Sequence, residues 1–332
     1  MNLYKLYIII ILSLSKIFLS ACDVVNFGDD ENSESGWNEI EFEDISTMRA
    51  VYFVNPNVGW LTDSSGNVLK TTDGGESWSE YGPGHQRSLN DIHFIDEDYG
   101  WAAGAGSYIF HSEDGGQTWK EQGSEIQESI SGVSFTDQEN GWIVNQYGAI
   151  IHTSDGGENW DEQFRDDSYV FSDVKFVDDE NGWAVGTGPD ERFLDESNES
   201  GVVFTNDGGK NWQTTETEEM GRLSGVRFTD QKNGWVVGEG SIYYTEDGGK
   251  NWEEQLNDAP VFFFSVDFVD SQYGWAGGTN GNMKYTNNGG QDWVAQELPN
   301  DENITDLFFT DKSKGWAVLS HTNDAPLLRY LD

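Results

Sequence analysis

The dipeptide Gly-Trp recurs seven times along this 332-residue chain, and its spacing constrains the fold more than any other feature. Successive tryptophans of these dipeptides are separated by 41, 41, 41, 52, 40 and 41 residues. A self-similar period of about 40 residues is typical of β-propeller blades. The dipeptides are Gly59-Trp60, Gly100-Trp101, Gly141-Trp142, Gly182-Trp183, Gly234-Trp235, Gly274-Trp275 and Gly315-Trp316.

A second motif, S/T-x-D-x-G-x-x-W, ends eighteen residues after most of these tryptophans. An aspartate followed by glycines can accept hydrogen bonds from turn amides while a glycine adopts positive φ, so we interpret this Asp box as a structural turn. A catalytic acid is needed once, whereas these aspartates repeat around the ring. The Asp-box residues are Asp73, Asp114, Asp155, Asp207 and Asp247, with Trp78, Trp119, Trp160, Trp212, Trp252 and Trp293; the sixth box has Asn288 in place of the aspartate.

Four short strands are expected in each period. In the third period, residues 133–135 alternate apolar and polar, a second strand starts at Trp142, residues 149–152 form an apolar run, and a fourth strand follows Trp160. We therefore predict an all-β fold, a seven-bladed β-propeller with four-stranded antiparallel blades.

The two ends of the chain are expected to complete one blade together. The seventh period stops before any Asp box, whereas Trp37 to Phe42 resembles the segments that follow the boxes elsewhere. Residues 37–43 would then supply the last strand of blade 7, which closes the ring and leaves no sheet edge open. The predicted propeller covers residues 37–332, with blades at about 44–83, 84–124, 125–165, 166–217, 218–257, 258–298 and 299–332.

The first 36 residues are expected to be an export signal and a tether. Residues 1–21 carry an early lysine, an apolar run and small residues before Cys22, the single cysteine of the chain, and this resembles a bacterial lipoprotein signal. We expect lipidation at Cys22, an acidic tether over residues 22–36, and a membrane-anchored protein of the cell envelope, on its periplasmic face or outer surface. The alternative is a plain secretion signal or a short membrane helix.

The charge of the chain limits its partners. Its 60 acidic and 18 basic residues give a formal net charge of −42. Such a charge repels nucleic-acid phosphates and anionic headgroups, so nucleic acid is excluded as a partner. The five histidines show no metal-ligand spacing and no catalytic constellation is evident, so we expect no cofactor, no metal and no enzymatic activity.

Function is expected where the repeats differ. In a propeller the loops from the fourth strand to the next blade share a face with the loops between second and third strands. We predict a partner-binding sector there, because arginine and aromatic residues are typical of interface hot spots. The alternative is that Phe171 and Phe264 pack between blades and the arginines pair with local acids. The predicted sector consists of Arg165, Arg192, Arg222, Tyr169, Phe262 and Phe263.

The repeat, with G-W-x-V-G followed by T-x-D-G-G-x-x-W, resembles the photosystem II stability and assembly factor family over residues 37–332. That resemblance implies a seven-bladed, non-enzymatic helper that holds a newly made reaction-centre protein through a basic, arginine-rich face. This chain has seven arginines and is strongly acidic, so it lacks that basic face.

We therefore predict a monomeric, lipid-anchored binding or assembly platform whose partner is another envelope protein. The Asp box is also similar to that of sialidases and two-propeller xyloglucanases. The alternative function is thus a glycan-binding or glycan-hydrolysing, sialidase-like propeller.

Overall fold

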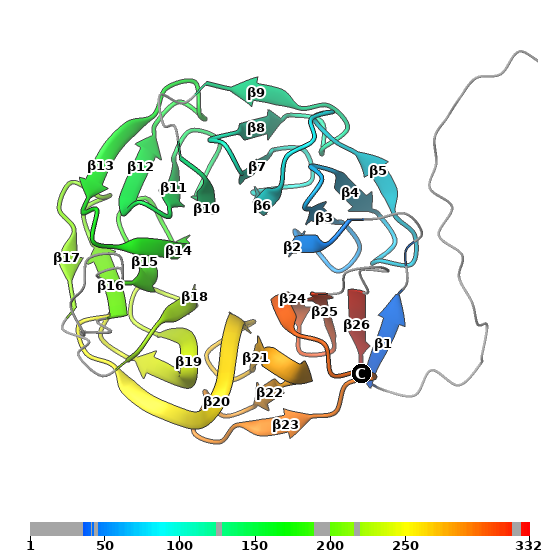
Figure 1. The fold of residues 1–332 in the computed structure, drawn as a ribbon, viewed down its shortest axis with the longest axis vertical. Helices are drawn as coiled ribbons and strands as arrows, with labels where there is room; N and C mark the ends of the chain where they lie inside the picture. Colours follow the sequence, from blue (N-terminus) through cyan, green and yellow to red (C-terminus); the bar gives the residue numbers. More distant parts are fainter. Residues whose placement is uncertain are drawn as a thin grey trace, which may run out of the picture.

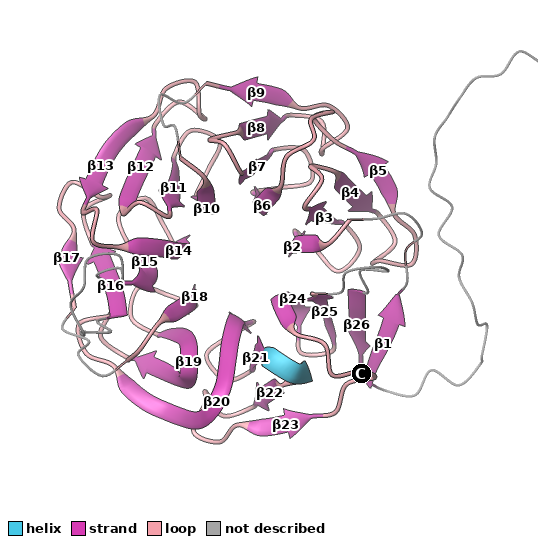
Figure 2. Ribbon diagram, in the orientation of Figure 1, coloured by secondary structure: helices cyan, strands magenta, loops and turns pink. Residues whose placement is uncertain are grey.

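The computed structural model describes residues 36–40, 42, 46–123, 128–188, 200–215, 220–320 and 327–332. The predicted signal, Cys22, the tether up to residue 35 and Arg192 lie outside these residues. The described strands radiate in antiparallel sheets around one axis, forming a closed ring (Figure 1). One short 3-10 helix, Thr279–Gly281, interrupts the strands of the described part (Figure 2).

Most sheets contain four strands, with the strand nearest the axis coming first in the sequence. The first two are β2 (Met48–Phe53), β3 (Gly59–Asp63), β4 (Val68–Thr71) and β5 (Ser79–Tyr81), then β6 (Leu89–Phe94), β7 (Gly100–Gly104), β8 (Ile109–Ser112) and β9 (Lys120–Gln122). The next two are β10 (Ile130–Phe135), β11 (Gly141–Asn145), β12 (Ala149–Thr153) and β13 (Asp161–Arg165), then β14 (Val170–Phe176), β15 (Gly182–Thr187), β16 (Ser200–Thr205) and β17 (Gln213–Thr214).

The fifth and sixth repeats form one six-stranded sheet, so the described strands make six sheets where seven separate four-stranded blades were predicted. The prediction is wrong at this point because β20 runs without a break from one repeat into the next. Its first half pairs with β19 and its second half with β21. The strands are β18 (Leu223–Phe228), β19 (Gly234–Thr245), β20 (Glu253–Phe268), β21 (Gly274–Gly278), β22 (Met283–Thr286) and β23 (Val294–Gln296).

The N-terminal strand closes the ring, as predicted. In the last sheet β1 (Gly36–Ile40) pairs antiparallel with β26 (Leu327–Leu331), outside β25 (Lys314–Leu319) and β24 (Ile304–Asp311). Trp37 packs edge-on against Phe309, with ring centroids 5.8 Å apart, and its Nε1 donates to Gln296 Oε1 at 3.1 Å. Both ends of the ring are therefore tied into the same sheet.

The Gly-Trp dipeptides hold neighbouring repeats together. Each tryptophan is buried and stacks on the last phenylalanine of the next repeat's innermost strand; Trp101 lies 3.6 Å from Phe135, centroid to centroid. Gly141 then lies against the other face of Phe135, where a Cβ would overlap the ring. Within the described residues seven such stacks run around the ring, the last one from Trp316 back to Phe53: Trp60–Phe94, Trp101–Phe135, Trp142–Phe176, Trp183–Phe228, Trp235–Phe268, Trp275–Phe309 and Trp316–Phe53.

The Asp boxes form the turns between third and fourth strands. Asp155 Oδ1 accepts hydrogen bonds from the Thr153 hydroxyl at 2.9 Å and from the Asn159 amide N–H at 2.8 Å. Its Oδ2 accepts from Asn159 Nδ2 at 2.7 Å. These carboxylates are therefore occupied by their own turns.

Candidate binding face and central channel

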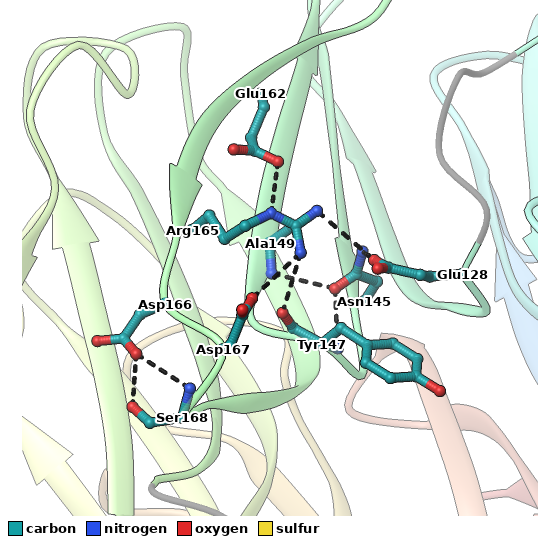
Figure 3. Close-up of polar contacts among 9 residues, drawn as sticks. All are labelled: Glu128, Asn145, Tyr147, Ala149, Glu162, Arg165, Asp166, Asp167 and Ser168. Atoms are coloured by element: carbon teal, nitrogen blue, oxygen red, sulfur yellow. Dashed lines mark hydrogen bonds and ion pairs between the residues drawn. The ribbon is translucent and has the colours of Figure 1, made fainter.

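Successive antiparallel strands place the loops of each repeat on two opposite faces of the ring. We call the face that carries the second-to-third-strand turns and the segments between repeats the arginine face. The face that carries the first-to-second-strand turns and the Asp boxes is the Asp-box face. Arg165, at the end of β13, donates from Nη1 to the carbonyl oxygen of Tyr147 in the β11–β12 turn at 3.4 Å, so the two loop types meet on the arginine face (Figure 3).

A buried asparagine shapes this part of the arginine face. Asn145 Oδ1 accepts from the main-chain N–H of Tyr147 at 2.9 Å and of Ala149 at 3.0 Å, and its Nδ2 donates to Glu128 at 2.6 Å. The turn is thereby fixed from inside. Tyr147 is carried outward and is 45% exposed.

Arg165 is surrounded by acids. Its Nε lies 2.7 Å from Glu162, its Nη1 3.4 Å from Asp167 and its Nη2 3.6 Å from Glu128, and the hydrogen bond to Glu162 raises the pKa of Arg165. A carboxylate from a partner would have to displace these local acids. For Arg165 the structure therefore matches the alternative interpretation, in which the arginines pair locally.

The aromatic residues of the predicted sector mostly serve packing. Phe263 is fully buried beside Trp235, so it cannot contact a partner, and its assignment to the face was wrong. Its position explains this, because β20 turns that side chain toward the core between repeats. Tyr169 stacks at 5.5 Å on buried Phe171, and Phe262 is half-buried, 5.1 Å from Phe264.

Arg222 precedes β18, and its carbonyl oxygen accepts from the Glu239 N–H at 2.9 Å, so this residue also lies at a loop junction. Two residues of the predicted sector, Arg165 and Tyr169, therefore lie close together where β13 leads into β14. Phe263 is buried and does not belong to the sector.

A second arginine of this face was missed as a site residue. Arg87 is exposed, its guanidinium lies over the Tyr108 ring at 5.3 Å, and His85 packs on the same ring at 4.9 Å. Among the described residues no carboxylate lies within ion-pair distance of Arg87. The lack of an acidic partner for Arg87 could have been predicted from the sequence, because residues 82–90 contain no aspartate or glutamate.

The innermost strands line a central channel with charged side chains. Asp91, Asp173 and Asp306 each accept a hydrogen bond from a main-chain N–H of the next repeat, at 2.7 Å from Val133, 2.9 Å from Val226 and 2.9 Å from Val51 respectively. An innermost strand has no neighbour on its axis side, so these carboxylates satisfy amides that would otherwise lack a partner.

Burial perturbs the ionisation of these groups. It raises the pKa of Asp306 to about 7 and of Asp173 to about 6, against an ordinary value near 4. Burial, followed by the charge of Arg227, lowers the pKa of Lys175 to about 8. Arg227 itself forms an ion pair at 2.9 Å with buried Asp267. Perturbed groups in a channel are candidates for function, although here they also hold repeats together.

The channel carboxylates have little capacity left for catalysis. Asp91 accepts main-chain N–H groups through both oxygens, and Asp306 accepts the Ser265 hydroxyl as well as the Val51 amide. Across the described part of the chain, no group of three or more His, Cys, Asp or Glu side chains is placed to hold a metal ion. The same residues include no helix long and apolar enough to cross a membrane.

The ring of antiparallel sheets and the repeated Asp boxes define the class of protein, an all-β propeller of Asp-box repeats. The profile of the family described as photosynthesis system II assembly factor YCF48 matches residues 83–166 and 162–261, which is more than half of the chain. The chain therefore belongs to the YCF48 family. No curated protein matches the sequence.

Solved structures agree on the fold. YCF48 bound to D1 peptide is 22% identical with a TM-score of 0.71, and the alignment covers 89% of this chain and 97% of that one. YCF48 from Cyanidioschyzon merolae is 20% identical with a TM-score of 0.70, covering 90% and 99%. The GH74 xyloglucanase from Xanthomonas campestris is 10% identical with a TM-score of 0.68, and this chain covers 56% of that enzyme.

Proposed function

We propose that the protein is a non-enzymatic binding or assembly platform that holds a segment of another protein. The observation that carries this proposal is the sequence match to the YCF48 family over more than half of the chain. One solved relative is YCF48 bound to D1 peptide, which supports a peptide or protein ligand for this chain as well.

The arrangement of acids supports a platform more than a hydrolase. Glycoside hydrolysis requires two carboxyl groups that can reach substrate from opposite sides. In this ring Asp91 and Asp173 accept main-chain hydrogen bonds from the next repeat, and the Asp-box carboxylates are occupied by their turns. These acids stabilise the scaffold.

On the arginine face we place the binding site around Arg87, Tyr108 and Tyr147. The Arg87 guanidinium lies over the Tyr108 ring and forms no ion pair with a described acid, whereas Arg165 is surrounded by three acids. An arginine already held against an aromatic ring loses less side-chain freedom when it binds, and arginine and tyrosine are enriched among interface hot spots. Arg165 lies beside Tyr147 at the edge of this site, with Tyr169 following in the next segment, whereas Arg222 and Phe262 lie on the same face in later repeats. Arg192 is proposed to extend the face.

We also infer that the six sheets of the ring are built from seven sequence repeats. Seven Trp–Phe stacks join the repeats of the described part, and the six-stranded sheet contains two Gly-Trp repeats. The proposed domain is the propeller at 37–332, preceded by a signal at 1–21 and a tether at 22–36. A lipid on Cys22 would anchor it in the cell envelope, where its partner would be another envelope protein.

The test is capture of partners from detergent-solubilised envelopes of the source organism, with mass spectrometry of what the full-length protein retains. We expect one protein to be retained by the wild type and lost with Arg87→Ala/Tyr147→Ala. Lys120→Ala is the control, because Lys120 lies on the outer strand β9 and pairs with Glu158 at 2.7 Å. Retention of the same protein by Arg87→Ala/Tyr147→Ala would overturn the proposed site.

The alternative is a glycan ligand or substrate, which the likeness to a GH74 xyloglucanase favours at the level of fold. Incubation with xyloglucan and with sialyllactose, followed by chromatography of the sugars, tests it directly. Release of sugar by the wild type would contradict the non-enzymatic proposal.

A further inference from the structure

A histidine closes the turn that carries Arg87. His85 Nδ1 accepts a hydrogen bond from the main-chain N–H of Arg87 at 3.1 Å. The His85 ring packs against two aromatic rings, 4.9 Å from Tyr108 and 4.5 Å from Phe110. The Arg87 guanidinium lies over the same Tyr108 ring at 5.3 Å. Both side chains of this turn therefore pack on one tyrosine.

Two glycines bring this turn into close contact with its neighbours. A Cβ on Gly66, in the β3–β4 turn, would lie 2.5 Å from the carbonyl oxygen of His85 and 2.6 Å from that of Arg87. A Cβ on Gly106, in the β7–β8 turn, would lie 2.7 Å from Arg87 Nη1. Because the main chain and the guanidinium of Arg87 are both closely packed, opening of the His85 turn would displace the guanidinium from Tyr108.

An asparagine makes the same hydrogen bond elsewhere in the ring. Asn300 occupies the position of His85, because each lies four residues before the innermost strand of its repeat. Asn300 Oδ1 accepts from the main-chain N–H of Glu302 at 3.2 Å. Gly281 approaches the Asn300 carbonyl oxygen as Gly66 approaches that of His85. The turn therefore needs a side-chain acceptor at this position, but it does not need an imidazole.

The imidazole can be this acceptor only while it is neutral. A neutral imidazole has one N–H, and because Nδ1 of His85 accepts, that proton is on Nε2. Protonation places a second N–H on Nδ1, which then faces the Arg87 N–H without a lone pair. It also adds a positive charge beside the Arg87 guanidinium on the same tyrosine ring. Both effects oppose the closed turn.

The surroundings of His85 favour its neutral form at neutral pH. Burial, first of all, lowers the pKa of His85 below its ordinary value of 6.5, and the charge of Arg87 lowers this pKa further. Glu121 of β9 has the opposite effect. Tyr108 is the titratable group of the β7–β8 side, and on the β3–β4 side the carboxylate of buried Asp63 accepts hydrogen bonds from its own turn.

We propose that His85 is a pH-sensitive positioning residue of the arginine-face site: its neutral imidazole holds Arg87 in place, and acidification releases Arg87. This inference rests on the proposed function, because it concerns the regulation of that same site. Binding of the partner should accordingly weaken as His85 becomes protonated.

The first test is amide hydrogen exchange of the full-length protein, read by mass spectrometry and corrected for the intrinsic pH dependence of exchange. Between about pH 7.5 and about pH 5, protection at residues 85–88 should fall about fivefold, which is the effect of one lost hydrogen bond. Residues 300–303 are the internal control, because the Asn300 acceptor does not titrate and their protection should stay constant.

Two variants separate the hydrogen bond from the charge. His85→Asn recreates the bond that Asn300 makes and should keep its protection at both pH values. His85→Ala removes the acceptor and should show low protection at both. Constant protection in the wild type, or an equal loss in His85→Asn, would overturn the inference.

The second test uses the protein captured in the test of the proposed function. The wild type should retain less of it in acid than at neutral pH, whereas His85→Asn should retain it equally at both. Equal retention by the wild type, despite a change in exchange, would overturn the effect on binding. If no protein is retained at either pH, the proposed function fails, while exchange still decides whether His85 positions Arg87.

Discussion

The sixth Asp box exchanges a hydrogen-bond donor and acceptor between two positions. In the other boxes an aspartate faces a serine, threonine or asparagine four residues later, as Asp155 faces Asn159. In the sixth box Asn288 Nδ2 donates to Asp292 Oδ2 at 2.9 Å, and Asn288 Oδ1 still accepts from the Thr286 hydroxyl and the Asp292 N–H. The same turn is thus made with the carboxylate moved by four residues.

This exchange predicts a rescue experiment in the third box. Asn159→Asp places a second carboxylate about 3 Å from that of Asp155, so a charge-assisted hydrogen bond worth about 1.5–3 kcal/mol is lost. Repulsion between exposed charges adds about 1 kcal/mol. We expect this variant to lose about 3 kcal/mol of unfolding free energy. Asp155→Asn/Asn159→Asp recreates the sixth box and should recover all but about 1 kcal/mol of it.

The assay is urea unfolding followed by tryptophan fluorescence at neutral pH and at pH 4 for the wild type, both single variants and the double variant. The deficit of Asn159→Asp should shrink at pH 4, because one carboxyl can then be protonated and donate to the other. Asp155→Asn is the control, because its amide can pair with a rotated Asn159 amide and should cost only about 1 kcal/mol. A double variant no more stable than Asn159→Asp would refute this account of the box.

Three further perturbations test other parts of the ring. Gly141→Ala pushes a methyl group into the Phe135 ring, and such overpacking should lower the unfolding free energy by about 1–3 kcal/mol. Urea titration measures this loss, and Gly123→Ala, at a position with open space around it, is the control. Burial raises the pKa of Asp306 to about 7, so between about pH 4 and 7 the folded state binds a proton more tightly than the unfolded state does. The unfolding free energy of the wild type relative to Asp306→Asn should therefore fall as pH rises through this range, by up to about 1.4 kcal/mol per pH unit. Above about pH 7 this difference should stay constant. Trp37→Ala removes the contacts with Phe309 and Tyr330 and should lower the unfolding free energy by about 2–3 kcal/mol. It should also increase amide hydrogen exchange in β26, the strand that pairs with β1. Unchanged exchange in β26 would contradict closure of the ring by β1.

The fold was predictable because each repeat carries the same residue types at the contacts that join neighbouring repeats. Trp101, Gly141 and Phe135 form one stack, and a Gly-Trp dipeptide follows the innermost-strand phenylalanine at the same six-residue distance in all seven repeats. Seven copies make a chance pattern implausible, and the unpaired ends of the chain indicate which strand completes the last sheet. The continuous strand β20 was not predictable, because Asn257, Asp258 and Pro260 favour a turn. The strand nevertheless continues through them, and Asn257 and Phe262 both pair with β19 on either side of a bulge.

The candidate site was less predictable, because its properties depend on neighbours that are distant in sequence. Arg165 was selected for its loop, but Glu128 and Asp167 approach it from two segments. The channel aspartates looked like ordinary polar positions of the innermost strands. Their raised pKa values arise only when the ring closes and buries them, as for Asp306 with Val51 at the junction of the last and first repeats.

Departures from the repeat fall into two kinds, and the difference between them separates scaffold from function. Asn288 departs from the Asp box, but Asp292 restores the lost hydrogen bond, so this departure is compensated inside the turn. Arg87 and Lys232 also depart, each reversing the charge found at Glu128 and Glu139 in the third repeat, and neither forms an ion pair with a described residue. Because every repeat imposes the same physical demands, an uncompensated departure cannot be explained by folding. Arg87 and Lys232 lie on opposite faces of the ring, so each face carries a position whose charge the repeat does not require.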